Sequence, residues 1–218
     1  MKYIGLTGSF GAGKSSVLEA LKNLGAIVFD ADEYVRLAQQ KGQPCYSELK
    51  KELGLDFFLP DGALDRKKLA DYVFSKPTAL KMVNGIVHPV VRKMHLFDLK
   101  TTHQTTPEAT VVYAIPLLFE TQWHLFTQSN WLVYCDIKIA KERLKILRNF
   151  TEKEIQTRLN HQLPQKEKIK LADIVIDNSG SWEKTKKEVE KNWLELQILP
   201  KWNFFTRIAE MEQYAFGC

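Results

Sequence analysis

The stretch "GLTGSFGAGKSS", residues 5–16, decides the fold of this 218-residue chain. It follows a short apolar run at residues 3–7 and precedes apolar residues at helical spacing that continue to Leu24. Residues 8–15 match the pattern G-x-x-x-x-G-K-[ST] at every fixed position. Glycines in such a turn leave backbone N–H groups open to a phosphate, because no Cβ blocks its approach. The stretch therefore predicts a loop that holds the phosphates of a nucleoside triphosphate.

Side chains next to this loop point to ATP with Mg²⁺. Lys14 carries a mobile charge that can reach the β and γ phosphates, and the helix that begins near it adds the positive end of its dipole. The Ser15 hydroxyl suits the coordination shell of Mg²⁺. A glycine-rich turn without a ligand is the disfavoured alternative. We expect ATP contacts at Gly11, Ala12, Gly13, Lys14, Ser15 and Ser16, with Ser15 also a metal ligand.

Near-continuous apolar runs predict a parallel sheet. The strand, loop, helix and second strand within residues 3–30 form a βαβ unit, which requires a parallel sheet covered by helices on both faces. About five strands are predicted from such runs. They lie at residues 3–7 and 26–30 and within "TVVYAIPLLF", "WLVYCDI" and "ADIVIDN". The fold class is therefore α/β, a three-layer P-loop fold.

Two segments interrupt the alternation of strands and helices. Residues 33–104 contain helical patterns without a convincing strand, and we interpret them as a helical insertion. Residues 139–171 are almost wholly polar and contain leucines at helical spacing. We interpret them as a helical hairpin. The predicted nucleotide-binding core then comprises residues 1–32, 105–138 and 172–200, followed by a tail at residues 201–218.

Composition limits the partners and the compartment. The net charge is +5 and the pI is about 9.0, which suits an anionic partner of unspecified kind. The run "QKEKIKLAD" mixes both signs and is interpreted as a solvated helix face. Cys45, Cys135 and Cys218 fit no metal spacing or disulfide framework, so we expect a reducing, cytoplasmic location. No signal peptide is recognised, and the longest apolar run has nine residues, too few to span a membrane.

The phosphate loop alone is common to kinases, switch GTPases, motor ATPases and translocases. A switch GTPase is expected to carry a guanine-reading N-K-x-D run, and the sequence contains none. A translocase usually needs a longer chain. The helical insertion after the second strand and the arginine-bearing hairpin favour a kinase of the adenylate-kinase type, which has an acceptor domain and a closing lid.

A more specific resemblance extends through most of residues 1–182. The chain resembles the dephospho-CoA kinase family in motifs that occur in order: "GLTGSFGAGKSS", "DADEYVR", "DGALDRKKLADYVF", "HPVV", "PLLFE", Arg143, Arg148, Gln162 and "ADIVIDNSG". The resemblance implies ATP-dependent phosphorylation of the ribose 3′-hydroxyl of dephospho-CoA, the last step of coenzyme A biosynthesis. It also implies that residues 33–104 bind the acceptor and that residues 139–171 are the lid.

Asp30 and Asp32 end the second predicted strand, at the carboxyl edge where open α/β sheets bind ligands. A carboxylate at this edge can orient the acceptor hydroxyl or hold Mg²⁺ through water. The resemblance points to Asp32 as the base-like catalytic residue, together with Lys14. The structural alternative for Asp32 is an N-cap of a helix that starts at Glu33.

Arg143 and Arg148 lie in the polar hairpin. Fixed guanidinium groups stabilise the charge that spreads over a transferring phosphoryl group. The residues alone leave a solvated helix face equally open, whereas the resemblance favours Arg148, and then Arg143, as catalytic phosphate ligands. Asn178 and Gly180 follow the last strand, where a loop in this type of kinase lies against adenine. A plain turn is the alternative for that loop.

Four more residues are expected to bind the acceptor substrate. Asp65 and Arg66 belong to the "DGALDR" motif, but a helix-start charge and a surface cation explain them equally well. His88 precedes a proline and is expected to line the acceptor pocket, with the end of a helix as its structural alternative. Glu120 closes "PLLFE" at the carboxyl edge, where it would fix the acceptor or a water on Mg²⁺, or serve only as a helix-start acid.

Several residues depart from the family pattern. Many relatives have Gly where Ser9 stands, Ile at Phe10 and Ser at Ala12. If position 9 required a positive φ, serine would be strained there by about 1 kcal/mol or more. Ala114 stands where many relatives carry an acidic residue. If that acid helps to hold Mg²⁺ in them, metal binding here would depend more on Ser15 and Asp32. The fixed positions of the phosphate loop are unaffected.

Two other functions stay in view. One is a kinase for a different small hydroxyl acceptor, such as a nucleoside monophosphate or a sugar acid. The other is a nucleotide-gated binding protein that holds nucleic acid with its basic hairpin. The favoured interpretation has dephospho-CoA and ATP as partners, with no nucleic acid and no membrane, and a monomer or weak oligomer.

Overall fold

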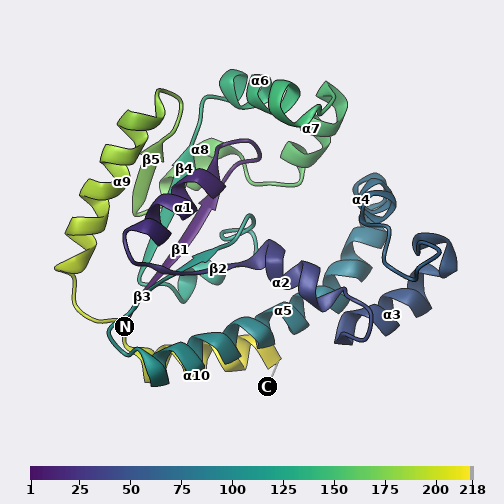
Figure 1. Cartoon of the computed structure of the whole chain (residues 1–218), viewed down its shortest axis with the longest axis horizontal. Coiled ribbons are helices and arrows are strands. Elements are labelled where there is room, and N and C mark those ends of the chain that lie inside the picture. Colours follow the sequence, from purple (N-terminus) through teal and green to yellow (C-terminus); the bar gives the residue numbers. More distant parts are fainter. Residues whose placement is uncertain (217–218) are drawn as a thin grey trace. The chain divides into compact units, whose positions relative to one another are not determined.

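The computed structural model describes residues 1–216, and the chain divides into two compact units. The first unit comprises Met1–Asp30 and Thr102–Arg207, and the second comprises Ala31–Thr101 and the chain from Ile208 onward. Figure 1 shows the ribbon coloured along the sequence. Cys218 lies outside the described residues. No helix in the described part of the chain is long and apolar enough to cross a membrane.

The first unit is built on a five-stranded sheet with the order β2-β3-β1-β4-β5, in which every neighbouring pair is parallel (Figure 1). This confirms the α/β class and the five predicted strands. The strands are β1 (Lys2–Gly8), β2 (Ile27–Asp30), β3 (Thr110–Ala114), β4 (Ser129–Tyr134) and β5 (Ile174–Asp177). Sequence order and sheet order differ because parallel neighbours need crossover connections rather than hairpins.

The central strand β1 positions the phosphate loop. Leu6 of β1 lies opposite Ala114 on one side and Trp131 on the other, and all three are fully buried. The strand ends at Gly8, level with Val133 of β4. The loop therefore begins at the carboxyl edge of the sheet, where parallel α/β folds bind ligands.

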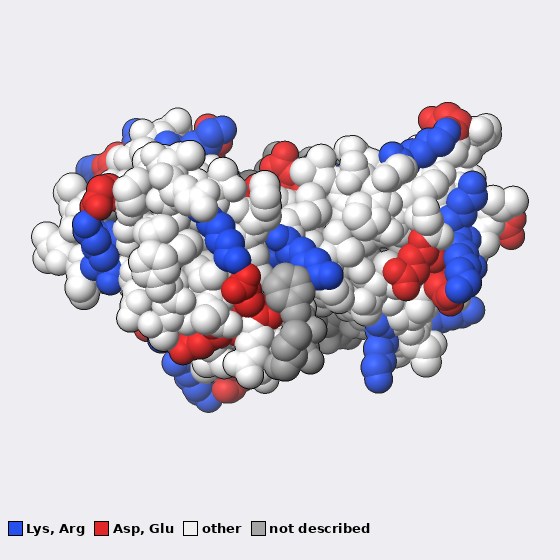
Figure 2. Space-filling model, turned by 90° about the horizontal axis from the view of Figure 1, so that it is seen from below, with Lys and Arg blue, Asp and Glu red and all other residues white. Residues whose placement is uncertain are grey.

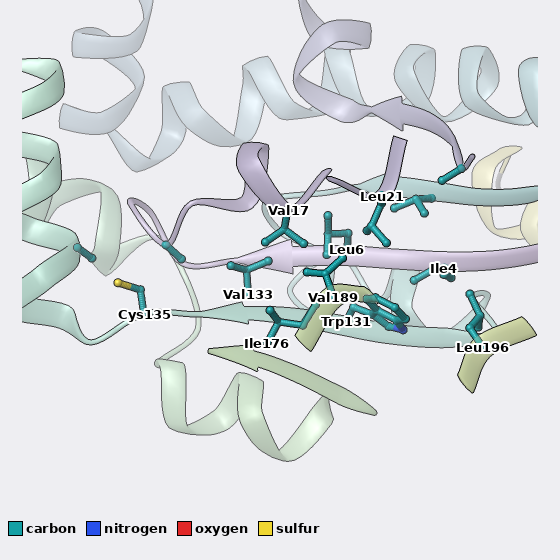
Figure 3. Close-up of a cluster of buried hydrophobic side chains, with 14 residues drawn as sticks. Ile4, Leu6, Val17, Leu21, Trp131, Val133, Cys135, Ile176, Val189 and Leu196 are labelled. Carbon is teal, nitrogen blue, oxygen red and sulfur yellow. The ribbon is translucent and has the colours of Figure 1, made fainter. Parts of the chain in front are cut away.

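One face of the sheet is covered by α1 (Lys14–Asn23) and α9 (Trp182–Gln197), which pack beside each other. Figure 3 shows Val17 and Leu21 of α1 and Val189 and Leu196 of α9 in one cluster with the side chains of the strands. The helical spacing of the apolar residues after the phosphate loop predicted this face of α1. The apolar face thus fixes the helix whose N-terminus completes the loop.

The segment predicted as a helical hairpin contains three helices: α6 (Ile137–Arg148), α7 (Glu152–Asn160) and α8 (Gln165–Leu171). Asp136 caps α6 and Thr151 caps α7 through side-chain hydrogen bonds to backbone N–H groups. Pro164 directly precedes α8, where a proline is compatible with the start of a helix. A short 3₁₀ helix, η2 (Trp123–Leu125), precedes β4.

The second unit is helical, with α2 (Ala31–Ala38), α3 (Pro44–Leu53), η1 (Leu55–Phe57), α4 (Arg66–Ser75), the main part of α5 (Pro77–Thr105) and most of α10 (Phe204–Phe216). Pro89 lies inside the continuous helix α5, so His88 does not end a helix. Cys45 is buried and free of a disulfide, as is Cys135 of the first unit.

The C-terminal tail, whose role the sequence left undefined, forms α10, and its part from Ile208 onward belongs to the second unit. Met211 of α10 is fully buried. Lys100 of α5 pairs with Glu212, and the guanidinium of Arg92 lies 4.5 Å from the centre of the Tyr214 ring. The aromatic residues at the start of the tail pack in the first unit, where Trp202 contacts Tyr3 and Phe204 stacks on His103.

Leu21→Ala tests the packing of α1. The side chain of Leu21 is fully buried, so its truncation should lower the free energy of unfolding by about 2–5 kcal/mol. Leu194→Ala on α9 is the matched control, since Leu194 is 68% exposed and should change stability by less than about 0.5 kcal/mol. Urea unfolding followed by circular dichroism measures both, and equal losses would contradict the described packing.

Candidate active site

The phosphate loop has a backbone conformation that glycine allows and other residues resist. Gly11 and Gly13 have φ values of 85° and 88°. A Cβ on Gly11 would lie 2.7 Å from Leu144 Cδ1, and a Cβ on Gly13 would overlap the side-chain nitrogen of Asn178. The two glycines are therefore required both by their dihedral angles and by their neighbours.

Asn178, expected as an ATP contact, holds the phosphate loop from the end of β5. Its Nδ2 donates a hydrogen bond of 2.8 Å to the Ala12 carbonyl, and its Oδ1 accepts one of 3.1 Å from Thr185 Oγ1. Its side chain is buried, and its own N–H donates to the Tyr134 carbonyl. The structure thus gives this amide a defined role in shaping the loop.

Lys14 and Asp30 are brought together at the carboxyl edge of the sheet. The Lys14 Nζ lies 3.7 Å from the Asp30 carboxylate, and both side chains are mostly buried. Ser15 and Ser16 are exposed at the start of α1. A lysine held beside an exposed helix N-terminus can exchange its carboxylate for a phosphate when a triphosphate binds.

Ser9 carries none of the strain that a positive φ would impose. Among the described residues other than glycine, positive φ values occur at Gln122 and Asn149 and not at Ser9. The condition under which serine would be unfavourable at this position is therefore not met. The turn is closed instead by a hydrogen bond of 2.9 Å from the Ala12 N–H to the Ser9 carbonyl.

Phe10 of the phosphate loop contacts the lid segment. Its N–H donates a hydrogen bond of 3.1 Å to Gln162 Oε1, and its ring meets the ring of Phe150 edge to face at 5.2 Å. The guanidinium of Arg158 lies 5.3 Å from the centre of the Phe10 ring and 4.8 Å from that of Phe150. Gln162, a motif residue without a derived role, is thus a partner of the loop. Sequence reasoning missed Arg158, although its place near Gln162 was a usable signal.

The two predicted lid arginines have different surroundings. Arg143 donates hydrogen bonds to the carbonyls of Asn178 at 2.8 Å and Gly180 at 3.5 Å. It therefore lies against the loop that was expected beside adenine. Arg148 is the last residue of α6 and is exposed. The structure brings Arg143, but not Arg148, to the loop after β5.

Glu120 forms a largely buried ion pair with Lys168. The two charged groups are 3.1 Å apart, and Glu120 Oε1 also accepts a hydrogen bond of 2.8 Å from the Leu163 N–H. Burial lowers the pKa of Lys168, and the Glu120 carboxylate opposes that shift. Lys168 belongs to the run "QKEKIKLAD", so the interpretation of that run as a solvated face is wrong at this residue. Helical periodicity did not reveal the buried partner, which is distant in sequence.

Three of the residues predicted to bind the acceptor, Asp65, Arg66 and His88, lie in the second unit. Asp65 caps α4, where its Oδ1 accepts a hydrogen bond of 2.9 Å from the Lys68 N–H. Arg66 donates a hydrogen bond of 2.8 Å to the Arg36 carbonyl. His88 is half-buried in α5, where burial lowers its pKa and nearby Arg92 lowers it further.

Asp32 is an exposed residue in the first turn of α2. The helix begins at Ala31 and not at Glu33, so the alternative of Asp32 as an N-cap is wrong. An acidic residue in the first turn interacts favourably with the helix dipole.

A magnesium ion fits the donors near the phosphate loop. Within residues 1–216, no three His, Cys, Asp or Glu side chains come together that could hold a metal ion by themselves. Mg²⁺ usually takes one or two protein oxygens and completes its shell with phosphates and water. The Ser15 hydroxyl and the Asp30 carboxylate near Lys14 are hard oxygen donors of this kind.

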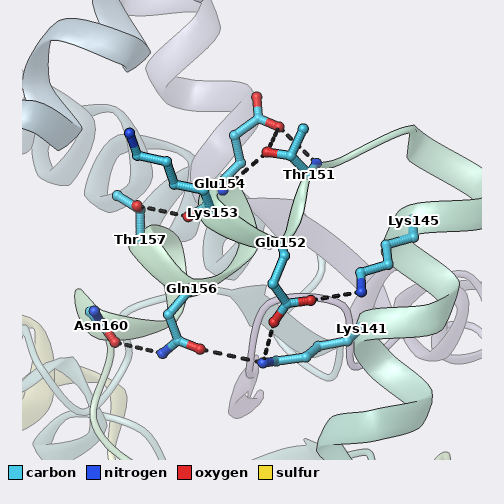
Figure 4. A network of polar contacts seen from close by, with 9 residues as sticks. All are labelled: Lys141, Lys145, Thr151, Glu152, Lys153, Glu154, Gln156, Thr157 and Asn160. Carbon is cyan, nitrogen blue, oxygen red and sulfur yellow. Dashed lines mark hydrogen bonds and ion pairs between the residues drawn. The ribbon is translucent and has the colours of Figure 1, made fainter.

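Charged side chains connect α6 and α7 within the segment predicted as the lid (Figure 4). Glu152 of α7 pairs with Lys141 at 2.6 Å and Lys145 at 2.7 Å, both on α6. Hydrogen bonds from these lysines lower the pKa of Glu152 from 4.5 to about 2. Thr151 and Glu154 form a reciprocal capping box at the start of α7. The two lid helices are thus tied together at their connection.

A surface groove of about 670 Å³ adjoins the phosphate loop between α1 and α9. Ser15 and Ser16 line one end of it, and Trp182 and Lys186 belong to α9. The carboxylates along the groove disfavour a polyanion, so the triphosphate is better placed over the loop itself. The remaining lining residues are Glu19, Ala20, Asn23, Leu24 and Glu190.

A phosphate-binding loop after the central strand of a parallel sheet, with a lysine and a serine at the start of the next helix, defines a P-loop protein. The comparisons with known proteins give its family. The family model described as Dephospho-CoA kinase matches residues 2–184. The chain therefore belongs to the dephospho-CoA kinase family, and the resemblance inferred from the motifs is confirmed.

A curated relative agrees with this assignment, and two solved structures share the fold. A dephospho-CoA kinase of Aquifex aeolicus is 38% identical over 196 residues, which cover 90% of this chain and 98% of the relative. The crystal structure of TT1252 from Thermus thermophilus is 31% identical with a TM-score of 0.77, covering 91% of this chain and 98% of that one. A dephospho-CoA kinase from Campylobacter jejuni, 23% identical with a TM-score of 0.67, covers 90% of this chain and 98% of its own and shares the fold.

Gly13→Ala tests the shape of the phosphate loop. The substitution should cost more than the roughly 1–2 kcal/mol of a positive φ alone, because the new Cβ displaces the Asn178 amide. Gly25→Ala is the matched control, since Gly25 has a φ of 99° and a Cβ there meets no described atom within 4 Å. Unfolding free energies and ATP binding are measured for both. If Gly13→Ala and Gly25→Ala lose equal amounts of unfolding free energy, and Gly13→Ala still binds ATP, the role of Asn178 is contradicted.

The lid ion pairs predict a pH dependence. Because the folded pKa of Glu152 is lowered, its contribution to stability is present above pH 4.5 and is lost as the pH falls through about 2. Carboxyl NMR should give a Glu152 midpoint near pH 2 in the wild type and a higher one in Lys141→Met. A wild-type midpoint near pH 4.5 would show that the pairs do not form in solution.

Proposed function

We propose that the chain transfers the γ-phosphoryl group of ATP to the ribose 3′-hydroxyl of dephospho-CoA, giving coenzyme A and ADP. The observation that carries this proposal is the phosphate loop at the carboxyl edge of the sheet, in a chain whose family model spans residues 2–184. A phosphotransferase of this kind acts mainly by positioning its substrates and stabilising charge.

The phosphate loop supplies the ATP site in this proposal. The backbone N–H groups from Gly11 to Ser16 would receive the phosphates, and Lys14 would leave Asp30 for the β and γ oxygens. Arg143 is already placed at the loop formed by Asn178 and Gly180, which we assign to the adenine side. Arg148 would contribute its charge on closure of the lid.

On the acceptor side, Asp32 acts as the base-like residue that orients the acceptor hydroxyl, and its exposure in α2 supports this role. We retain Asp65, Arg66 and His88 as contacts of the acceptor substrate. Each would bind the substrate while keeping part of its present contacts. Glu120 belongs to the same group, because only one of its carboxylate oxygens is engaged.

Mg²⁺ would be held by the Ser15 hydroxyl together with oxygens of the nucleotide, and by Asp30 or Asp32 directly or through water. When bound, the ion would neutralise charge on the β and γ phosphates. Ala114 contributes no ligand, so the metal depends on these few protein oxygens. This arrangement agrees with the preference of Mg²⁺ for a shell completed by phosphates and water.

We further propose a cytoplasmic enzyme that acts as a monomer or weak oligomer, without a nucleic-acid or membrane partner. Figure 2 shows one face of the described residues, on which Lys and Arg side chains are interspersed with acidic and uncharged ones. A nucleic-acid surface usually gathers basic residues in a continuous stripe. On this face of the described residues, the basic side chains do not form such a stripe.

The test is acceptor-dependent ADP release. With ATP and Mg²⁺, adding dephospho-CoA should increase ADP release, and the product should be coenzyme A. ATP turnover that is unchanged by dephospho-CoA, and that rises with a nucleoside monophosphate or a sugar acid instead, would overturn the assignment. A salt-sensitive shift of RNA in a gel would favour the nucleic-acid alternative.

Two substitutions test the residue roles. Lys14→Ala should abolish turnover while the fold is retained, and Lys22→Ala, an exposed lysine in the last turn of the same helix, should not. Asp32→Asn should reduce kcat by about 10²-fold or more with little change in the KM for ATP, since general-base assistance contributes about 10²–10⁴-fold. Equal losses in kcat and ATP affinity would instead indicate a metal-binding or structural role.

A further inference from the structure

Lys168 is the one fully buried ionic side chain among the Lys, Arg, Asp and Glu residues of the described chain. Burying an ammonium group is unfavourable unless a partner compensates its charge. That partner is Glu120, whose side chain is itself only 17% exposed. A pair kept in the interior at this cost is poorly explained by stability alone, because apolar residues of similar size would stabilise the fold as well or better.

The Glu120 carboxylate is fixed through one oxygen and has the other unused. Oε1 receives both the Lys168 ammonium at 3.1 Å and the Leu163 N–H at 2.8 Å. Oε2 is buried and has no hydrogen-bond partner among the described residues. A buried acceptor atom without a partner is unfavourable in the free protein. Because this atom is covered in the free protein, a ligand reaches it only when the surrounding side chains move on binding, and a hydrogen bond donated to Oε2 would then remove this cost.

The segment that carries Lys168 reaches three loops at the carboxyl edge of the sheet. Gln162 accepts a hydrogen bond of 3.1 Å from the Phe10 N–H of the phosphate loop. Leu163 and Lys168 bind Glu120 after β3, and Gln165 Nε2 donates a hydrogen bond of 2.9 Å to the Cys135 carbonyl after β4. The position of the Glu120 carboxylate is therefore set by the same short segment that contacts the phosphate loop.

We propose that Lys168 is a positioning residue that acts through Glu120. Lys168 holds the Glu120 carboxylate in a fixed position, so that Oε2 accepts a hydrogen bond from the acceptor substrate. This inference rests on the proposed phosphoryl transfer and deepens it, because it assigns a residue outside every recognised motif to acceptor binding. A fixed acceptor atom matters for affinity because a flexible one would have to be ordered on binding.

A double-mutant cycle tests the proposal with Glu120→Gln, Lys168→Met and the double variant. Each single substitution should raise the KM for dephospho-CoA by about tenfold, whereas the KM for ATP should stay within about twofold. The double variant should be no worse than Glu120→Gln alone, because Lys168 acts only through that carboxylate. Lys170→Met is the matched control, since Lys170 lies on the same helix but is 67% exposed and pairs with exposed Glu167.

Several outcomes would overturn the proposal. If the increases in the KM for dephospho-CoA multiply in the double variant, Lys168 acts independently of Glu120. A lower melting temperature with an unchanged KM for dephospho-CoA would leave the pair a purely structural role, and equal increases in both KM values would indicate a general distortion. If Lys168→Met does not fold, the double variant, which buries no charge, is compared with Glu120→Gln instead. A higher KM for dephospho-CoA in the double variant than in Glu120→Gln would contradict the proposal.

The wild-type control separates this proposal from the proposed function. If the wild-type enzyme does not use dephospho-CoA, the functional assignment fails before any variant is compared. The same cycle is then measured with whichever acceptor supports ADP release. Failure of the cycle in a wild-type enzyme that does use dephospho-CoA rejects the role of Lys168 alone.

Discussion

The hydrogen bond from the Asn178 side chain to the Ala12 carbonyl is the interaction on which the site depends. It ties the phosphate loop after β1 to the end of β5, although the two segments are far apart in sequence. The amide occupies the space that a Cβ at Gly13 would need, so the glycine and the asparagine require each other. A loop shaped in advance by such contacts presents its N–H groups to a phosphate without a large ordering cost on binding.

Other contacts in the site hold charged and aromatic side chains in place in the free protein. Asp30 holds the Lys14 ammonium at the edge of the loop, and Arg143 is held by the carbonyls of Asn178 and Gly180. Phe10 connects the loop to the lid through Gln162, Phe150 and Arg158. In the proposed reaction, Lys14 and Arg143 are thus held near the loop before the substrates arrive.

The sequence was sufficient for the sheet and the loop, because apolar runs and glycine spacing are local signals. The five strands and the start of α1 were predicted from them, and the family was predicted from its resemblance in motifs along residues 1–182. Lys168 was missed because helical periodicity identifies an apolar face but not which lysine is buried against a distant carboxylate. The third lid helix and Arg158 were missed for a similar reason, since their contacts lie far along the chain. Asp32 was correctly placed near the end of β2, but the helix begins earlier than its cap pattern suggested.

The measurement that tests the account most directly is a crystal structure with a non-hydrolysable ATP analogue, Mg²⁺ and dephospho-CoA. The account predicts that the triphosphate lies on the backbone N–H groups of residues 11–16. It also predicts that Lys14 moves from Asp30 to the β and γ oxygens and that the ribose 3′-hydroxyl faces the γ phosphate. A structure in which Lys14 stays paired with Asp30, or in which the nucleotide occupies another surface, would contradict it.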